Sequence, residues 1–104
     1  LVSLSPRPWF RPPFGGVNAA VVASVAAAGY PRTIMWDVDT ADWNLEADGG
    51  PTADEIVAKV AAKVQGGSIV LMHLGGYDTL DALPDIVTGL TERGFDLVNL
   101  DTMF

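Results

Sequence analysis

Ser68-Ile69-Val70-Leu71-Met72-His73 is the stretch that best predicts the fold of this chain. The run is apolar and uncharged until it ends in the single histidine of the sequence, and glycine pairs flank it at 66–67 and 75–76. A short apolar run between such breaks is typical of a strand that is buried on both faces of a parallel sheet. Parallel-sheet proteins carry their chemistry at the carboxyl ends of their strands. His73 is therefore the first candidate functional residue.

Strands and helices are predicted to alternate along the whole chain. Short apolar runs indicate the strands, and alanine- and valine-rich stretches with a helical period indicate the helices. The expected elements are strands at 9–11, 33–38, 68–73 and 95–100, and helices at 17–28, 52–65 and 79–93. Such alternation with short links predicts right-handed crossovers and a parallel sheet.

Helix-terminal signals support these assignments. Asn18 is the expected N-cap of the first helix, and Thr52 with Glu55 forms the capping box of the second. Thr79 is expected to cap the third helix, and Pro84 about one turn later predicts a bend or a broken first turn. The predicted buried stripe of the third helix consists of Leu80, Leu83, Ile86, Val87 and Leu90.

The predicted fold class is α/β, with four parallel strands alternating with three helices. Three right-handed crossovers can place all helices on one face of the sheet, as in a barrel. The strands are apolar throughout, so the other face also requires burial, which a closed barrel provides by packing it against the opposite strands. Those opposite strands are missing from this sequence. The chain is therefore expected to form about half of a (β/α) barrel.

Composition excludes several classes of function. The chain has 104 residues and 49% hydrophobic residues, which fits one small domain or part of a larger one. The net charge is −7 and only six residues are Lys or Arg, which argues against a nucleic-acid partner or an anionic membrane. No cysteine is present, so a thiolate metal site is excluded. The apolar runs are too short for a transmembrane segment.

Three motifs follow three successive predicted strands, and in a barrel they would meet on one rim. They are Arg11-Pro-Pro-Phe14-Gly15, Asp39-Thr-Ala-Asp42-Trp43 and Leu71-Met-His73. His73 is either a histidine that caps a strand end or a general acid or base that titrates near neutrality. Asp39 and Asp42 either cap a turn or provide a carboxylate that holds the imidazole of His73.

Arg11 and Trp43 each allow two interpretations. Arg11 is either an ordinary solvated arginine or, because it lies between Phe10 and Pro12, a partly buried one that needs a carboxylate partner. The backbone N–H groups of Phe14 and the next glycine follow the last proline, where they could point at an oxyanion. Trp43 is either a core residue or, as a loop tryptophan, part of a sugar-binding pocket.

These motifs, in this order and spacing, resemble the third, fourth and fifth motifs of the polysaccharide deacetylases, that is, the NodB-homology domain or carbohydrate esterase family 4. Residues 90–100 are also similar to the last helix and strand of that family. The resemblance implies a distorted (β/α) barrel and metal-dependent removal of N- or O-acetyl groups from chitin, peptidoglycan, xylan or related glycans. Residues 1–104 would then be the C-terminal part of a single such domain.

The resemblance also implies catalytic roles for three residues. His73 would be the general acid that protonates the leaving amine. Asp42 would orient His73 and favour its protonated form, and Arg11 would hold and tune the catalytic base.

Three further residues are implied to contact the substrate, and one to have a structural role. The backbone N–H of Phe14 would help to stabilise the oxyanion. Trp43 and Leu71 would form the apolar wall around the acetyl methyl group. Asp39 is expected to have only a structural role at the rim.

The first two motifs of the family are absent from this sequence. They supply a catalytic-base aspartate, a metal-ligand aspartate and two metal-ligand histidines. A divalent metal, usually zinc, would be bound by that missing N-terminal part, so no metal ligand is expected here. The chain is predicted to be inactive by itself. An extracellular or cell-envelope location is expected from the polymer substrates of the family only.

Two alternatives remain at this stage. The first alternative to a deacetylase is a non-catalytic, glycan-binding remnant that uses Trp43. The second is an unrelated α/β domain in which the three motifs are helix or turn caps and core residues. An Asp-Asp strand end followed by a His-x-x-x-His upstream would favour the deacetylase.

Overall fold

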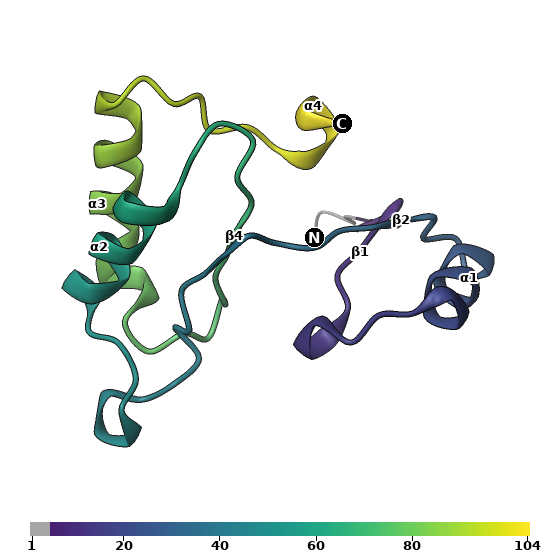
Figure 1. Ribbon diagram of the computed structural model, residues 1–104, viewed down its shortest axis with the longest axis horizontal. Coiled ribbons are helices and arrows are strands. Elements are labelled where there is room, and N and C mark those ends of the chain that lie inside the picture. Colours follow the sequence, from purple (N-terminus) through teal and green to yellow (C-terminus); the bar gives the residue numbers. More distant parts are fainter. Residues whose placement is uncertain (1–4) are drawn as a thin grey trace. The chain divides into compact units, whose positions relative to one another are not determined.

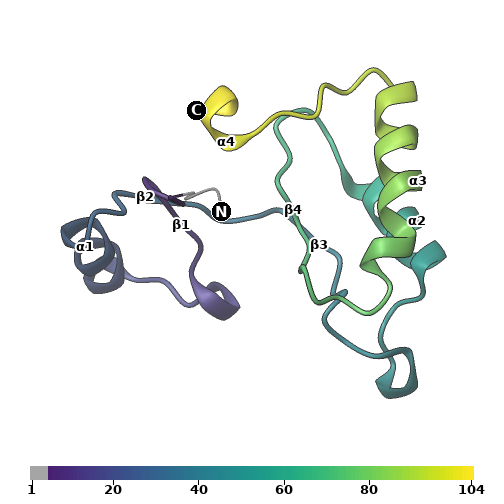
Figure 2. The ribbon, with the colours of Figure 1, turned by 180° about the vertical axis from the view of Figure 1, so that it is seen from behind.

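The computed structural model describes residues 5–104, so the first four residues of the predicted domain 1–104 lie outside the described part. The chain divides into two compact units, Leu1–Met35 and Trp36–Phe104. Each unit contains one ladder of two parallel strands together with at least one helix (Figures 1 and 2).

The first unit is a small strand–helix–strand element. Its elements are β1 (Trp9–Phe10), the 3₁₀ helix η1 (Pro13–Gly15), α1 (Ala19–Ala27) and β2 (Arg32–Thr33). Strand β1 pairs in parallel with β2. The predicted N-cap of α1 is confirmed, because Asn18 Oδ1 accepts the backbone N–H of Val21 at 2.9 Å.

The second unit carries most of the regular structure. Its elements are β3 (Val38–Asp39), η2 (Glu46–Asp48), α2 (Ala53–Lys63), β4 (Val70–Leu71), α3 (Thr79–Glu92) and α4 (Leu100–Met103). Strands β3 and β4 pair in parallel, with Val38 opposite Val70 and Asp39 opposite Leu71. The capping box of α2 is confirmed, because Thr52 and Glu55 exchange two hydrogen bonds of 3.1 and 3.3 Å.

The core of the second unit lies between α2, α3 and β3. The two helices run side by side (Figure 1) and bury one cluster together with a residue of β3. This core cluster consists of Val38, Ile56, Val60, Ala82, Ile86 and Leu90. The helix pair therefore covers one face of the β3–β4 ladder.

Helix α3 differs from its prediction in three respects. Asp78 is its N-cap, not Thr79, and the helix runs through Pro84 without the expected break. The buried stripe is Ala82, Ile86 and Leu90, whereas Leu80 is 80% exposed. The i, i+4, i+8 row that contains the small Ala82 faces α2, which brings the two helices close together.

The predicted strand at 33–38 is divided between the two ladders. Residues 32–33 pair with β1, and residues 38–39 pair with β4. Asp37 contributes to this break, because its carboxylate accepts the backbone N–H of Ile69 at 2.5 Å and the hydroxyl of Ser68 at 2.7 Å. A side chain thus takes up a backbone donor that a continuous ladder would use.

The predicted strand at 95–100 is wrong. Residues 95–99 have no regular structure, and α4 begins at Leu100. Asn99 caps this helix, since its Oδ1 accepts the backbone N–H of Thr102 at 2.9 Å. The cap competes locally with strand formation. Strand β4 accordingly has one partner strand, β3, within residues 5–104, and its ladder spans two residues instead of the predicted six.

The α/β class with parallel strands is confirmed, whereas the half-barrel stays a prediction. The four strands form two separate ladders among the described residues, not one four-stranded sheet. No helix within residues 5–104 has the length and apolar character needed to cross a membrane.

Candidate functional site

Asp42 and His73 form a close pair in the second unit. Asp42 lies in the loop after β3, and His73 follows β4. Because the two strands are parallel and in register, their carboxyl ends meet at the same edge. His73 Nδ1 lies 2.7 Å from Asp42 Oδ1, and the histidine side chain is 31% exposed while that of Asp42 is fully buried.

The loop after β3 is shaped to present Asp42. Thr40 is fully buried, and its hydroxyl donates to the carbonyl oxygen of Leu71 at 2.9 Å. Asp39 Oδ1 accepts the backbone N–H of Ala41 at 2.9 Å, and Ala41 has a φ of 55°. Ala41 thus adopts the left-handed conformation that reverses the chain. These contacts tie the loop to β4 and hold Asp42 beside His73.

The Asp42 carboxylate is satisfied on both oxygens. Oδ1 contacts the His73 ring, while Oδ2 accepts the backbone N–H of His73 at 2.7 Å and the hydroxyl of Thr79 at 2.5 Å. Burial raises the pKa of Asp42, but the hydrogen bonds from Thr79 and His73 outweigh it, so the pKa lies below its ordinary value. Asp42 is therefore ionised at neutral pH.

An ionised Asp42 determines the tautomer of its partner. A carboxylate can only accept hydrogen bonds, so Nδ1 of His73 must be the donor in this contact. In the neutral imidazole the proton then lies on Nδ1, and Nε2 is the nitrogen that gains or loses a proton. The pair can therefore orient a general acid or base, with Nε2 as the reacting atom.

Gly76 has no side chain, and this leaves room for the contact between Thr79 and Asp42. A Cβ at this position would lie 1.9 Å from Thr79 Oγ1 and 2.6 Å from Asp42 Oδ2. The backbone N–H of the next residue, Tyr77, donates to the Asp42 carbonyl at 3.2 Å. Sequence reasoning treated this glycine as a strand boundary and Thr79 as a helix cap. Their position in the short segment that runs from the Leu-x-His motif to the first residue of α3 was the available signal for a role near His73.

Trp43 and Leu71 flank the pair in sequence. Trp43 is 59% exposed in its loop, so it is not a core residue. Leu71 is half-buried in β4, two residues before His73. Trp43 therefore offers an indole surface to solvent in the same loop as Asp42.

Arg11 and Phe14 belong to the first unit, and the cluster around His73 consists of residues of the second unit. Of the two interpretations of Arg11, the structure supports the exposed arginine, and the adjacent Pro12 is buried. Phe14 lies in η1 with a φ of 57°, and its side chain is fully exposed. Of the six predicted site residues, the structure brings Asp42 and His73 into contact.

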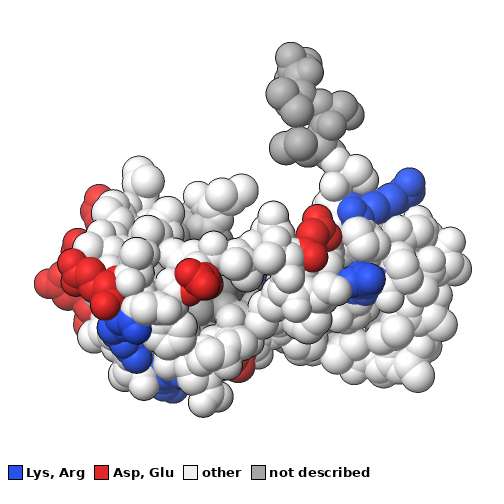
Figure 3. All heavy atoms as spheres, turned by 90° about the horizontal axis from the view of Figure 1, so that it is seen from above, with Lys and Arg blue, Asp and Glu red and all other residues white. Residues whose placement is uncertain are grey.

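The described residues do not form a metal site. Among residues 5–104, no group of three or more His, Cys, Asp or Glu side chains is arranged to hold an ion. These residues therefore do not fit a divalent metal by themselves. The acidic side chains drawn in Figure 3 all belong to the second unit, because every Asp and Glu of the sequence lies within residues 36–104.

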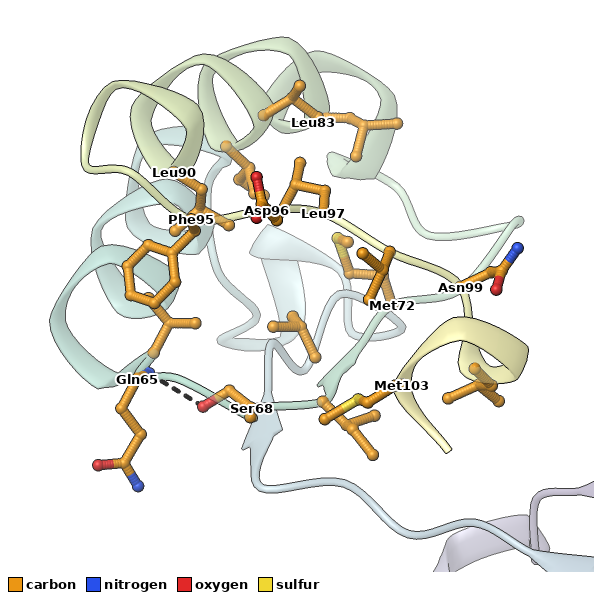
Figure 4. A pocket seen from close by; sticks show the side chains of 18 residues that line it. Gln65, Ser68, Met72, Leu83, Leu90, Phe95, Asp96, Leu97, Asn99 and Met103 are labelled. Carbon is orange, nitrogen blue, oxygen red and sulfur yellow. Dashed lines mark hydrogen bonds between the residues drawn. The ribbon is translucent and has the colours of Figure 1, made fainter.

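A separate pocket of about 630 Å³ lies elsewhere in the second unit. Figure 4 shows side chains from α3, from the residues around β4 and from the segment 95–103 pointing into it. Its lining is largely apolar, with Met72, Leu83, Leu90, Phe95 and Met103 among the labelled residues. His73 does not line this pocket. Residues 95–100, the predicted last strand, form part of its lining.

The fold and the site together define an α/β protein in which an ionised aspartate contacts a histidine at the carboxyl ends of two adjacent parallel strands. No family model matches the chain. The chain is, however, 39% identical over 92 residues to a bifunctional xylanase/xylan deacetylase of Cellvibrio japonicus, with 86% of this chain and 13% of that protein covered. It is 35% identical over 99 residues to a peptidoglycan-N-acetylglucosamine deacetylase of Bacillus cereus, with 90% and 44% covered.

The chain is also similar in structure to solved proteins of carbohydrate esterase family 4. A carbohydrate esterase family 4 pseudoenzyme from Bacillus anthracis superimposes with a TM-score of 0.77 at 36% identity, covering 91% of this chain and 31% of that one. The chain is thus a homologue of the polysaccharide deacetylases of carbohydrate esterase family 4. It spans 13% to 44% of the length of the curated relatives named above.

Proposed function

We propose that this chain is the C-terminal part of a polysaccharide deacetylase domain and supplies the general-acid side of its active site. The observation that carries this proposal is the contact between His73 Nδ1 and the buried Asp42 carboxylate. The names of the relatives, which include xylan and peptidoglycan deacetylases, support the substrate class. The domain would remove acetyl groups from such a glycan.

His73 is the proposed general acid. With Nδ1 bound to Asp42, a proton on Nε2 is available to the leaving nitrogen of an acetamide. After water has added to the carbonyl carbon of the acetamide, the tetrahedral intermediate collapses and the C–N bond breaks. The electron pair of that bond goes to the nitrogen, which takes the proton from Nε2 and departs as a free amine, while the acetyl group leaves as acetate. Asp42 orients the ring through its contact with Nδ1.

The remaining roles are proposed from the family resemblance. Arg11 would hold the catalytic base, the Phe14 backbone N–H would stabilise the oxyanion, and Trp43 with Leu71 would line the acetyl pocket. Because the described residues do not fit a metal, a divalent ion such as zinc is proposed to be held by residues outside this chain. An extracellular or cell-envelope location is proposed from the polymer substrates of the family.

The test is a chimaera in which this chain replaces the aligned region of the Bacillus cereus deacetylase. We expect the chimaera to deacetylate acetylated chito-oligomers, and the 104-residue chain by itself to be inactive. His73→Asn should lower kcat of the chimaera by roughly 10²–10⁴-fold, the usual contribution of a general acid. Glu92→Gln, an exposed charge at the end of α3, is the control. A folded chimaera that is insensitive to His73→Asn contradicts the proposal.

A second candidate function is glycan binding without catalysis. The exposed Trp43 favours it, as does the similarity to a solved pseudoenzyme. Titration of the chain with chito-oligomers, compared between the wild type and Trp43→Ala, tests this candidate. Tryptophan-dependent binding together with an inactive chimaera would favour it over deacetylation.

A further inference from the structure

We propose that Thr79 is a positioning residue that acts on His73 through Asp42. Its hydroxyl holds the Asp42 carboxylate in the orientation that keeps the His73 ring bound through Nδ1 and directs Nε2 to the substrate side. The catalytic meaning of this inference rests on the proposed function, whereas the geometric claim does not.

The hydrogen-bond pattern around Asp42 supports this role. One oxygen, Oδ1, contacts the His73 ring, and the other, Oδ2, takes the Thr79 hydroxyl and the backbone N–H of His73. A carboxylate that is held at both oxygens cannot rotate about its Cβ–Cγ bond without breaking these contacts. Among residues 5–104, Thr79 is the only side chain besides the His73 ring with a recorded hydrogen bond to this carboxylate.

The position of Thr79 in the fold makes it a rigid support. It is the first residue of α3, whose N-cap is Asp78, and its hydroxyl bonds to Asp42 instead of to its own helix. Helix α3 is anchored one turn later by Ala82, which is fully buried in the core cluster. As a β-branched residue, threonine also has few χ1 rotamers. The core therefore determines where this hydroxyl lies.

Gly76 provides the necessary clearance. Its missing Cβ would overlap both Thr79 Oγ1 and Asp42 Oδ2, at 1.9 and 2.6 Å. The neighbouring Gly75 has nothing within 4 Å of the same position. Gly76 and Gly75 are therefore a matched pair of positions for substitution by alanine. A Cβ at Gly76 would meet the Thr79–Asp42 contact, and a Cβ at Gly75 would lie in open space.

The first experiment measures two NMR signals in the 104-residue chain. Nitrogen shifts of the single histidine report its tautomer, and the side-chain carboxyl carbon of Asp42 reports its pKa. The wild type should show the Nδ1–H tautomer in the neutral ring. Thr79→Val, which keeps the shape but lacks the hydroxyl, should raise the pKa of Asp42 and reduce the Nδ1–H population. Thr79→Ser should restore both signals.

A steric variant tests the same contact independently. Gly76→Ala keeps the Thr79 hydroxyl but must displace it, so it should reproduce the tautomer shift of Thr79→Val. Gly75→Ala should match the wild type. His73 is the titratable group recorded in contact with the Asp42 carboxylate within residues 5–104, and the tautomer is therefore read at a pH where the ring is neutral.

Three results would overturn the inference. The first is a wild type with the Nε2–H tautomer, which needs no variant to fold. The second is a folded Thr79→Val with unchanged Asp42 and His73 signals, and the third is a folded Gly76→Ala with the wild-type tautomer. None of these readouts depends on catalysis, so an inactive chimaera would refute the proposed function and leave this inference intact.

Discussion

At the scale of single residues, hydrogen bonds lower the pKa values of both Asp37 and Asp42, although one carboxylate is exposed and the other is buried. Asp37 is exposed, and the Ser68 hydroxyl and the Ile69 backbone N–H lower its pKa by hydrogen bonding. Asp42 is buried, which by itself raises the pKa, but the donors Thr79 and His73 reverse the effect. Both carboxylates therefore bind protons less readily in the folded chain than in the unfolded one.

This difference makes stability depend on pH. A lowered folded-state pKa contributes stability that is complete above the unfolded value of about 3.9 and is lost as the pH falls through the folded value. The urea midpoint should therefore fall as the pH is lowered from 5 to about 3. Asp42→Asn should make the urea midpoint change less with pH. Asp37→Asn measures how much of the change is due to the exposed carboxylate. An Asp42→Asn variant with the wild-type pH dependence would contradict this assignment.

At the scale of elements, the α2–α3 pair supplies every residue of the core cluster except Val38 of β3. Ile56 of α2 is fully buried in the core cluster, whereas Leu80 of α3 is 80% exposed. Ile56→Ala should lower the free energy of unfolding by about 2–5 kcal/mol, because it removes buried methyl groups and leaves a cavity. Leu80→Ala is the matched control and should cost less than about 0.5 kcal/mol. Urea unfolding followed by far-UV circular dichroism measures both, and equal costs would refute the observed core.

At the scale of the whole molecule, exposed apolar surface favours association. Phe14 and Leu74 are fully exposed, Phe104 is 61% exposed, and each ladder within residues 5–104 contains only two strands. Apolar patches and strand edges of this kind pair with other chains. Sedimentation should show an average mass that rises with protein concentration, and Leu74→Glu should reduce the rise. A monodisperse monomer with one cooperative unfolding transition would contradict this expectation.

Local signals in the sequence determined the α/β class, the helices α1, α2 and α3, and the Asp42–His73 candidates. Asn18 and the Thr52–Glu55 box were predictable because a cap depends on residues within one turn of it. The Asp42 and His73 motifs were found because both follow short strands, and parallel strands bring such ends together.

Only the tertiary structure decided the contacts between distant segments. Thr79 carries the sequence signature of a helix cap, yet its hydroxyl bonds to Asp42, 37 residues away. The segment 95–100 has the composition of a strand, but within residues 5–104 no partner strand pairs with it. Arg11 is exposed while the adjacent Pro12 is buried, and the local sequence had left the burial of Arg11 open. Caps and helical periods are local properties, whereas strand pairing and burial require a partner elsewhere in the chain, and one sequence read in order does not identify that partner.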